Sequence, residues 1–451
     1  MKRTVFKGRF TVLALLLLVA SIIPVAFAIG VNPFRLLTTT ENGLSTWNSD
    51  MIDIESVSET GEGVYVAVLD TGLAPNWRDY FPEERILTRL GKGFVQPVSF
   101  EWIEDEPTPN IRGEVHESTF IGSSSSTHGT SVISTIIGYF YDSSEDTAAG
   151  YPLPPIVVRG IATNVNIIPV KVLADYTIPP NPEYEIPAHV VNFGTGDMVA
   201  AGIDYATDLA IEGYSPMIII IDVVGRRMEA VEQIAIARAI VNGVIVVAPA
   251  GDEGVSGMTY PGGYPPVITV GAVGWTGEWL HPGDGPFNPL WWLQSDYYPY
   301  ADIPESTPLT ELYIPSWSSR QQPGQQIDVL APGSWIRGPS LGYAHIPWWS
   351  GGAGDILGYN LGNFYFVGGT GMAAPHVTGV AALMLEKNPT LTQGQIEAIL
   401  GSTSLFIPAG SATVFMPTPT GGEFVTVNWG YDATGRGLVQ AKAAVDAVPP
   451  P

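Results

Sequence analysis

The chain has 451 residues, enough for one large domain or two ordinary ones, and its 45% hydrophobic and 14% charged residues exclude a coiled coil and a disordered tail. Its 20 basic and 44 acidic residues give a net charge of −24, which repels nucleic-acid phosphates at long range, so no nucleic acid is expected as a partner. The chain has no cysteine, which excludes disulfides, thiolate metal sites and a cysteine nucleophile.

The N-terminus has the ordered features of an export signal. Basic residues precede an apolar run from Phe10 to Ile23, and the small-residue site Ala26-Phe27-Ala28 follows a proline. This order predicts a signal peptide over residues 1–28 and a secreted or extracytoplasmic protein. Because the apolar stretch is nearly as long as a bilayer span, an uncleaved N-terminal anchor in the cell membrane is the alternative, and only then is a membrane partner expected.

Beyond the signal, short β-branched runs alternate with amphipathic helical runs, as in parallel strands joined by crossover helices. The expected strands are Val64–Leu69, Val165–Leu173, Met217–Val224, Val244–Ala248 and Val267–Val270. The expected helices are His128–Ile137, Asp197–Ile211, Glu229–Val241, Met372–Glu386 and Gln393–Leu400, the last with Thr392 and Gln395 as a capping box. Since the strands are apolar throughout, the pattern predicts one α/β domain with a central, mostly parallel sheet covered by helices on both faces.

Three stretches do not follow this pattern: residues 91–126, 139–155 and 275–314. Each is longer than the usual connection of about 4–6 residues, so each is expected to be a functional surface loop or an ordered insertion. The third contains Trp291 and Trp292 among tyrosines and prolines. Two interpretations of it stay open, a loop that buries its own aromatic side chains and an exposed surface that binds a partner.

Chemistry is indicated by three separate segments. Asp70 ends an apolar strand in Val-Ala-Val-Leu-Asp-Thr-Gly, and the carboxyl edge of a parallel sheet is where α/β proteins gather their active sites. His128 stands in Ser-Thr-His-Gly-Thr at the start of a helical run, and residues 368–383 form a glycine-rich turn that leads into a helix of small residues. Alone, such an aspartate is typical of a helix cap and such a histidine of a packing residue, but the three together are far more specific.

The motifs Val-Leu-Asp-Thr-Gly, His-Gly-Thr and Gly-Thr-x-Met-Ala-Ala-Pro-His-Val, in that order, resemble those of the subtilisin-like serine peptidases. The resemblance covers residues 47–448 and implies the family's three-layer fold. It also implies that Asp70 orients the imidazole of His128, which acts as general base on a serine hydroxyl. The position of that serine is occupied by Gly371, which has no side-chain atom to attack a carbonyl.

The same resemblance places further residues near the site. In the loop whose asparagine amide stabilises the oxyanion in the family, this chain has Asp252, and an ionised carboxylate accepts hydrogen bonds but cannot donate them. An edge strand for an extended peptide is still expected, since such pairing uses main-chain groups. The resemblance implies that the substrate-binding residues are Val223, Val224, Gly225, Ala248, Pro249, Ala250 and Gly251.

These departures predict an exported, non-catalytic homologue of the subtilisin-like peptidases, a pseudoenzyme that binds a peptide or protein. One alternative is an active serine endopeptidase with an unrecognised nucleophile, such as Thr370, and another is a structural component of an extracellular assembly. No cofactor is expected to be required. Structural calcium, which relatives often use, stays open, but no loop identifies its ligands, so no metal-binding residue is assigned. Residues 29–46 leave no space for an inhibitory prodomain, and none is expected.

Overall fold

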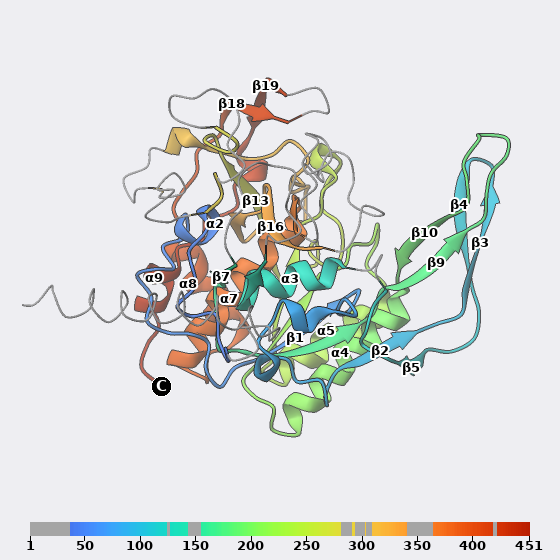
Figure 1. Cartoon of the computed structure of the whole chain (residues 1–451), viewed down its shortest axis with the longest axis horizontal. Helices are drawn as coiled ribbons and strands as arrows, with labels where there is room; N and C mark the ends of the chain where they lie inside the picture. The colour runs from blue at the N-terminus through green and yellow to red at the C-terminus, as the bar shows by residue number, and fades with distance from the viewer. Residues whose placement is uncertain are drawn as a thin grey trace, which may run out of the picture.

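The computed structural model describes residues 37–123, 127–142, 155–280, 291–293, 303, 309–340, 364–417 and 422–451. Within them, a mostly parallel sheet runs through the centre of the molecule (Figure 1). The predicted signal peptide and the alternative membrane anchor lie outside the described residues. Among the helices that the structure describes, none combines the length and the apolar character needed to cross a bilayer.

The sheet has the strand order β14-β13-β12-β11-β1-β8-β2-β5, and β15 also pairs with β13. Its parallel strands are β1 (Tyr65–Asp70), β2 (Lys92–Val95), β8 (Asn166–Lys171), β11 (Met217–Ile221), β12 (Ile245–Pro249), β13 (Ile268–Trp275) and β15 (Val329–Pro332). The antiparallel edges are β5 (His116–Ser118) and β14 (Leu312–Tyr313). All five predicted strands are confirmed, but β11 stops at Ile221, three residues before the predicted end.

Helices cover both faces of this sheet. One hydrophobic cluster joins alternate β1 residues such as Val66 and Val68 to α3 (His128–Ile137) and α7 (Thr370–Lys387). The other joins the intervening residues, such as Leu69, to α4 (Gly196–Ile211) and α5 (Ala230–Val241). The chain therefore has the predicted three-layer α/β fold, because each buried strand supplies apolar side chains to both layers.

The remaining helices are short or peripheral. They are α2 (Trp47–Asp50), α8 (Gln393–Thr403) and α9 (Ala441–Asp446). The predicted capping box of α8 is present. The backbone N–H of Thr392 donates to the Gln395 side chain, and the Thr392 side chain accepts the backbone N–H of Gln395. Such reciprocal capping satisfies two backbone donors at a helix start.

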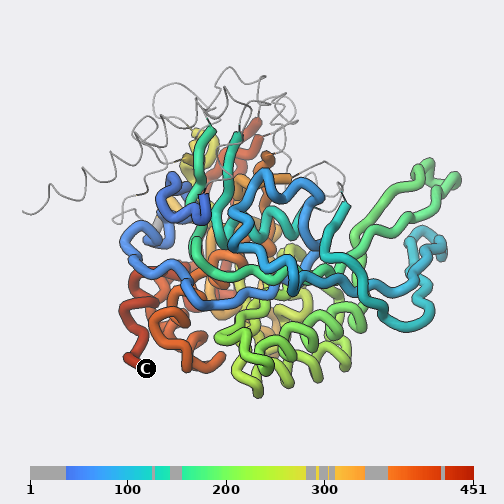
Figure 2. The backbone as a smooth tube through the Cα atoms, turned by 60° about the horizontal axis from the view of Figure 1, so that its bottom comes forward, coloured from blue at the N-terminus to red at the C-terminus, as the bar shows by residue number. Residues whose placement is uncertain are grey.

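The first predicted insertion is built of strands rather than of irregular loop. Its ends, β2 and β5, join the central sheet, and its middle is a hairpin of β3 (Val98–Ile103) and β4 (Glu106–Ile111). A second hairpin, β9 (Ala174–Ile178) with β10 (His189–Phe193), was not predicted. Phe100 contacts Tyr176 and Phe193 across the two hairpins, which project from the body as an arm in both views (Figures 1 and 2).

The second insertion also begins as a strand. Gly138, with a φ of +76°, ends α3 and starts β6 (Gly138–Tyr141), which pairs antiparallel with β7 (Ile156–Arg159). A side chain at Gly138 would meet the carbonyl oxygen of Val158, so the turn needs glycine. Two further antiparallel pairs among the described strands lie outside the central sheet. They are β16 (Ile336–Pro339) with β17 (Phe364–Val367) and β18 (Gly410–Met416) with β19 (Glu423–Trp429).

The tryptophans of the third insertion are buried, as in the first of the two interpretations, but they do not pack only on their own loop. Trp291 contacts Trp279 from the same stretch and also Trp47 and Phe366. Trp292 contacts Phe366 too, and both tryptophans are at most 1% exposed. Local sequence could not show this, because the partners come from both ends of the chain.

Candidate active site

Three neighbouring strands of the central sheet, β12, β11 and β1, each end close to an aspartate. Asp70 is the last residue of β1, Asp222 directly follows β11, and Asp252 lies in the loop after β12. Leu69 and Ile221 are partners in the parallel register, and the backbone N–H of Asp222 donates to the Leu69 carbonyl oxygen at 3.1 Å. Parallel pairing thus brings carboxylates from distant segments to one edge of the sheet.

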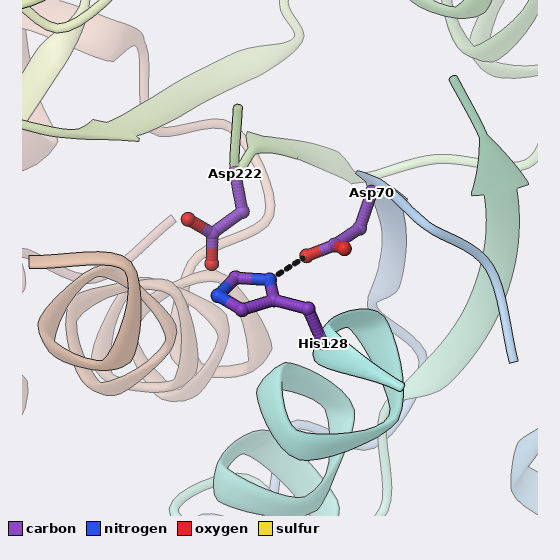
Figure 3. A group of neighbouring side chains, drawn as sticks. All are labelled: Asp70, His128 and Asp222. Atoms are coloured by element: carbon purple, nitrogen blue, oxygen red, sulfur yellow. Dashed lines mark hydrogen bonds and ion pairs between the residues drawn. The ribbon is translucent and has the colours of Figure 1, made fainter. Parts of the chain in front are cut away.

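The structure brings Asp70 and His128 together as the sequence predicted. Nδ1 of His128, the first residue of α3, donates to Asp70 Oδ2 at 2.8 Å (Figure 3). Two further hydrogen bonds connect the segment after β1 to the start of α3. The Gly129 N–H donates to the Thr71 hydroxyl at 3.0 Å, and the Ala74 N–H donates to the Thr130 hydroxyl at 2.8 Å. The Asp70 side chain is fully buried, whereas that of His128 is 39% exposed.

Asp222 is a site residue that the sequence analysis missed. Figure 3 shows its carboxylate pointing at the imidazole of His128, which is also faced by Asp70. Asp222 is 4% exposed, and its Oδ2 is buried with no hydrogen-bond partner among the described residues. The available signal was the apolar run Met217–Ile221 ending in aspartate, which repeats the pattern that singled out Asp70.

Gly371, the second residue of α7, lies beside this pair. A Cβ atom built on Gly371 would be 3.4 Å from His128 Nε2 and 2.8 Å from Asp222 Oδ1. The second distance is shorter than real Cβ contacts, so any side chain at position 371 would force Asp222 to move. The Asp222 carboxylate therefore fills part of the space that a residue larger than glycine would need.

Asp252 lies at the start of the same helix. Its Oδ1 accepts hydrogen bonds from the backbone N–H and the hydroxyl of Thr370, at 2.8 and 2.9 Å. The Thr370 hydroxyl also accepts the Gly251 N–H at 2.9 Å, so this side chain is used as donor and acceptor within the loop. Asp252 thus acts as a cap on α7, with its carboxylate accepting and not donating.

The carboxylates control the protonation of the site. Burial disfavours the imidazolium form of His128, but Asp70, Asp222 and Asp252 outweigh it and raise the pKa of His128 to about 10. Burial also raises the pKa of Asp222, opposed by His128, and that of Asp252, opposed by its hydrogen bonds from Thr370 and by His128. The carboxylates thus favour the protonated form of His128, and burial favours the neutral form of Asp222 and Asp252.

The predicted substrate-binding residues fall into two groups. Ala248 and Pro249 belong to β12, are buried and pair with β13, and Ala250 is also fully buried. Gly251 is buried as well, and its carbonyl oxygen accepts the Ser319 N–H. These four positions are committed to the protein's own structure, so they offer no open edge to a peptide.

The other group follows β11. Gly225 exchanges both of its main-chain hydrogen bonds with Tyr260, at 2.8 and 2.9 Å, and is not free to pair with a peptide. Val223 is 8% and Val224 is 61% exposed. Within the described part of the chain, neither valine makes a main-chain hydrogen bond to another backbone group. Of the seven residues predicted to bind substrate, only Val223 and Val224 have main-chain groups available to pair with a peptide.

One group of side chains could hold a metal ion. Asp70, His128 and Asp222 each offer a ligand atom, and these atoms lie within 4.8 Å of one another. No other group of three such residues is found in the ranges that the structure describes. No calcium loop was predicted, and these three residues have a nitrogen donor that calcium does not favour.

Comparisons with known proteins agree with this fold. Subtilisin E from Bacillus subtilis (strain 168) is 26% identical over 358 residues, which cover 78% of this chain and 64% of the length of that relative. Fervidolysin from Fervidobacterium pennivorans is 27% identical over 404 residues, 86% of this chain and 41% of that protein. The solved structure of the S41 psychrophilic protease superimposes with a TM-score of 0.52 at 17% identity, covering 89% of this chain and 99% of that one.

The family model described as the subtilase family, Peptidase_S8, matches residues 61–431. The match includes β1 with Asp70, α3 with His128 and all of α7 with Gly371. It lies within residues 47–448, over which the motifs were found. The chain therefore belongs to the subtilase family of subtilisin-like peptidases.

Proposed function

We propose that this protein is a non-catalytic subtilase that binds a peptide or protein at the carboxyl edge of its sheet. The observation that carries the proposal is the position of Gly371, where a Cβ would lie 3.4 Å from His128 Nε2. In this interpretation Gly371 stands where active members of the family have their nucleophilic serine. A glycine there leaves the dyad of Asp70 and His128 without a hydroxyl to activate.

Two further features oppose peptidase chemistry. The carboxylates around His128 raise its pKa, which favours the imidazolium form, and that form cannot take a proton from a nucleophile. Asp252 replaces the expected amide donor with an acceptor, which disfavours a developing oxyanion. Thr370, the alternative nucleophile, uses its hydroxyl in bonds to Asp252 and Gly251.

Peptide binding is supported by the main chain of Val223 and Val224. An extended peptide can add to a strand edge through backbone hydrogen bonds, without any catalytic group. Backbone groups without main-chain partners among the described residues are suited to this role. Binding outside the cytoplasm is part of the proposal, on the strength of the export signal in the sequence. A relative from a Thermus strain, 25% identical over 365 residues, is named an extracellular serine proteinase.

Labelling with a fluorophosphonate probe tests the loss of catalysis. We expect no labelling and no peptide hydrolysis above background from the unmodified chain. Hydrolysis that disappears in His128→Ala would establish the endopeptidase alternative instead. Amide hydrogen exchange tests the binding edge: a tryptic digest of casein should slow exchange at Val223 and Val224. Slowing only at distant amides, or at none, would contradict this edge as the binding site.

A further inference from the structure

We propose that His128 and Asp222 bind a divalent cation of the zinc type, with Asp70 orienting the imidazole from the other side. The three residues come from the end of β1, the start of α3 and the end of β11, so rigid elements hold them. One nitrogen of His128 and one carboxylate oxygen of each aspartate lie within 4.8 Å of one another. The inference rests on one part of the proposed function, that position 371 carries no nucleophile.

The first argument is the unpaired oxygen of Asp222. Its Oδ2 is buried and has no hydrogen-bond partner in the described residues, although the residue is 4% exposed. Leaving a buried polar group unsatisfied costs about 1–3 kcal/mol, and more for a charged group. Each such group calls for an explanation, of which a bound ion is one. A cation bound to this carboxylate would provide the missing partner.

The second argument is the division of roles between the two imidazole nitrogens. Nδ1 of His128 donates to Asp70 Oδ2 at 2.8 Å, which fixes the ring and leaves Nε2 for coordination. A histidine ligand that donates its other nitrogen to a carboxylate is the usual arrangement around protein-bound zinc. Figure 3 shows the Asp222 carboxylate on the side of the ring that carries Nε2. Coordination would displace any proton from that nitrogen, because only the neutral imidazole binds a metal.

The third argument is the space that Gly371 leaves. A Cβ on Gly371 would be 2.8 Å from Asp222 Oδ1 and 3.4 Å from His128 Nε2, so this spot is close to both ligands. Zinc binds nitrogen and oxygen at about 2.0–2.2 Å. A residue with a side chain would crowd the carboxylate that has to reach the metal. Glycine at position 371 therefore leaves room for the Asp222 carboxylate beside His128.

The donor set selects the class of metal. One imidazole nitrogen and one carboxylate, with the remaining positions open to water or a bound group, suit zinc and its neighbours, such as cobalt, whereas calcium needs 6–8 oxygens. A divalent cation would offset the charge of the buried Asp70 and Asp222 carboxylates.

Calorimetric titration of the metal-free, full-length protein with zinc chloride tests the proposal, with cobalt absorption as a second readout. We expect one zinc ion bound per chain and cobalt bands typical of a four- or five-coordinate site. Asp222→Ala should weaken binding by more than about 100-fold, and Asp70→Asn by about 10- to 100-fold. Gly371→Ala should also weaken binding, because its methyl group crowds Asp222. Glu278→Gln, a change at a buried carboxyl elsewhere, should leave affinity unchanged.

His128→Gln guards against misfolding of the Asp222 variant, because this side chain is partly exposed and its loss leaves the core intact. It should bind zinc more weakly by a similar factor and show no zinc-dependent rise in its unfolding temperature. Absence of zinc binding to the unmodified chain, or full affinity in both Asp222→Ala and His128→Gln, would overturn the proposal. Probe labelling of the metal-free chain would instead contradict the loss of the nucleophile and leave the titration result standing.

Discussion

Asp222 and Glu278 are both buried carboxyl residues, but their surroundings differ. Glu278 is 2% exposed and accepts three hydrogen bonds, from the Trp275 backbone and from the hydroxyls of Tyr313 and Ser334, at 2.7–3.0 Å. Asp222 is 4% exposed, and one of its oxygens has no partner in the described residues. Burial alone therefore does not mark a functional acid. At Asp222 an unpartnered oxygen occurs on a carboxylate that points at the His128 imidazole, and this combination marks a functional acid.

The largest expected effect is the recovery of serine chemistry. Gly371→Ser alone should label weakly with the fluorophosphonate probe, because its Cβ would lie 2.8 Å from Asp222 Oδ1. Adding Asp222→Ala should raise labelling strongly, since it clears that space and removes a charge that holds the proton on His128. Adding Asp252→Asn should raise peptide turnover by a further ~10²–10³. His128→Ala in the triple variant is the control and should abolish labelling.

Equal labelling of Gly371→Ser with and without Asp222→Ala would show that Asp222 does not obstruct position 371. In that case the difference between Asp222 and Glu278 in hydrogen bonding would have no consequence for the active site. Strong labelling of the double variant without any gain in turnover from Asp252→Asn would limit the role of Asp252 to capping α7.

The stability of the two alanine variants should differ in the metal-free protein. Glu278→Ala removes the acceptor for three donors and leaves the buried hydroxyls of Tyr313 and Ser334 without it. The variant should therefore have a free energy of unfolding lower by about 3 kcal/mol. Asp222→Ala removes a group that is only partly satisfied, and its effect should stay below about 1 kcal/mol. Chemical denaturation measures both. A larger loss for Asp222→Ala than for Glu278→Ala would reverse the comparison.

Glu278 should also make its own contribution to the pH dependence of stability. Burial, opposed by its three hydrogen bonds, raises the pKa of Glu278 from 4.5 to about 8. Between these values the folded state binds a proton that the unfolded state has released, so this group makes the protein less stable as pH rises from about 4.5 to 8. In Glu278→Gln this part of the pH dependence should vanish. Unfolding midpoints of the unmodified chain and of Glu278→Gln, measured across this pH range, check the prediction. If the two midpoints change with pH in the same way, the pKa assigned to Glu278 is wrong.

The smallest effect is expected at an exposed acid. Asp446 is the last residue of α9 and forms an ion pair with Lys442 one turn earlier. Exposed pairs of this kind contribute little to stability, because water and salt screen them. Asp446→Asn should therefore leave the unfolding midpoint unchanged within error. A shift as large as that of Glu278→Ala would show that hydrogen bonding in the interior does not distinguish these acids.

Prediction from sequence succeeded where the signal is local. Periodic apolar runs located the strands and helices of the three layers, and the capping box of Thr392 and Gln395 needs only a four-residue segment. It located the insertion at 91–126 but did not predict the strands of the arm. The strand β4 contains two prolines and alternating polar residues, and such a strand is stable only when paired with its neighbour. The prediction also extended β11 into Val223 and Val224, which have strand-like side chains but leave the sheet.

The sequence by itself determined the α/β class, the family motifs and the replacement of the expected serine by Gly371, since each is written in contiguous residues. Only the tertiary structure decided what surrounds Gly371. Asp222 meets His128 because β11 pairs with β1 in a register that aligns Ile221 with Leu69. Gly225 was taken from the peptide edge by pairing with Tyr260. Such meetings depend on strand register and loop closure between distant segments. A strand that is apolar on both faces, such as β11, has no alternating pattern that would fix its register.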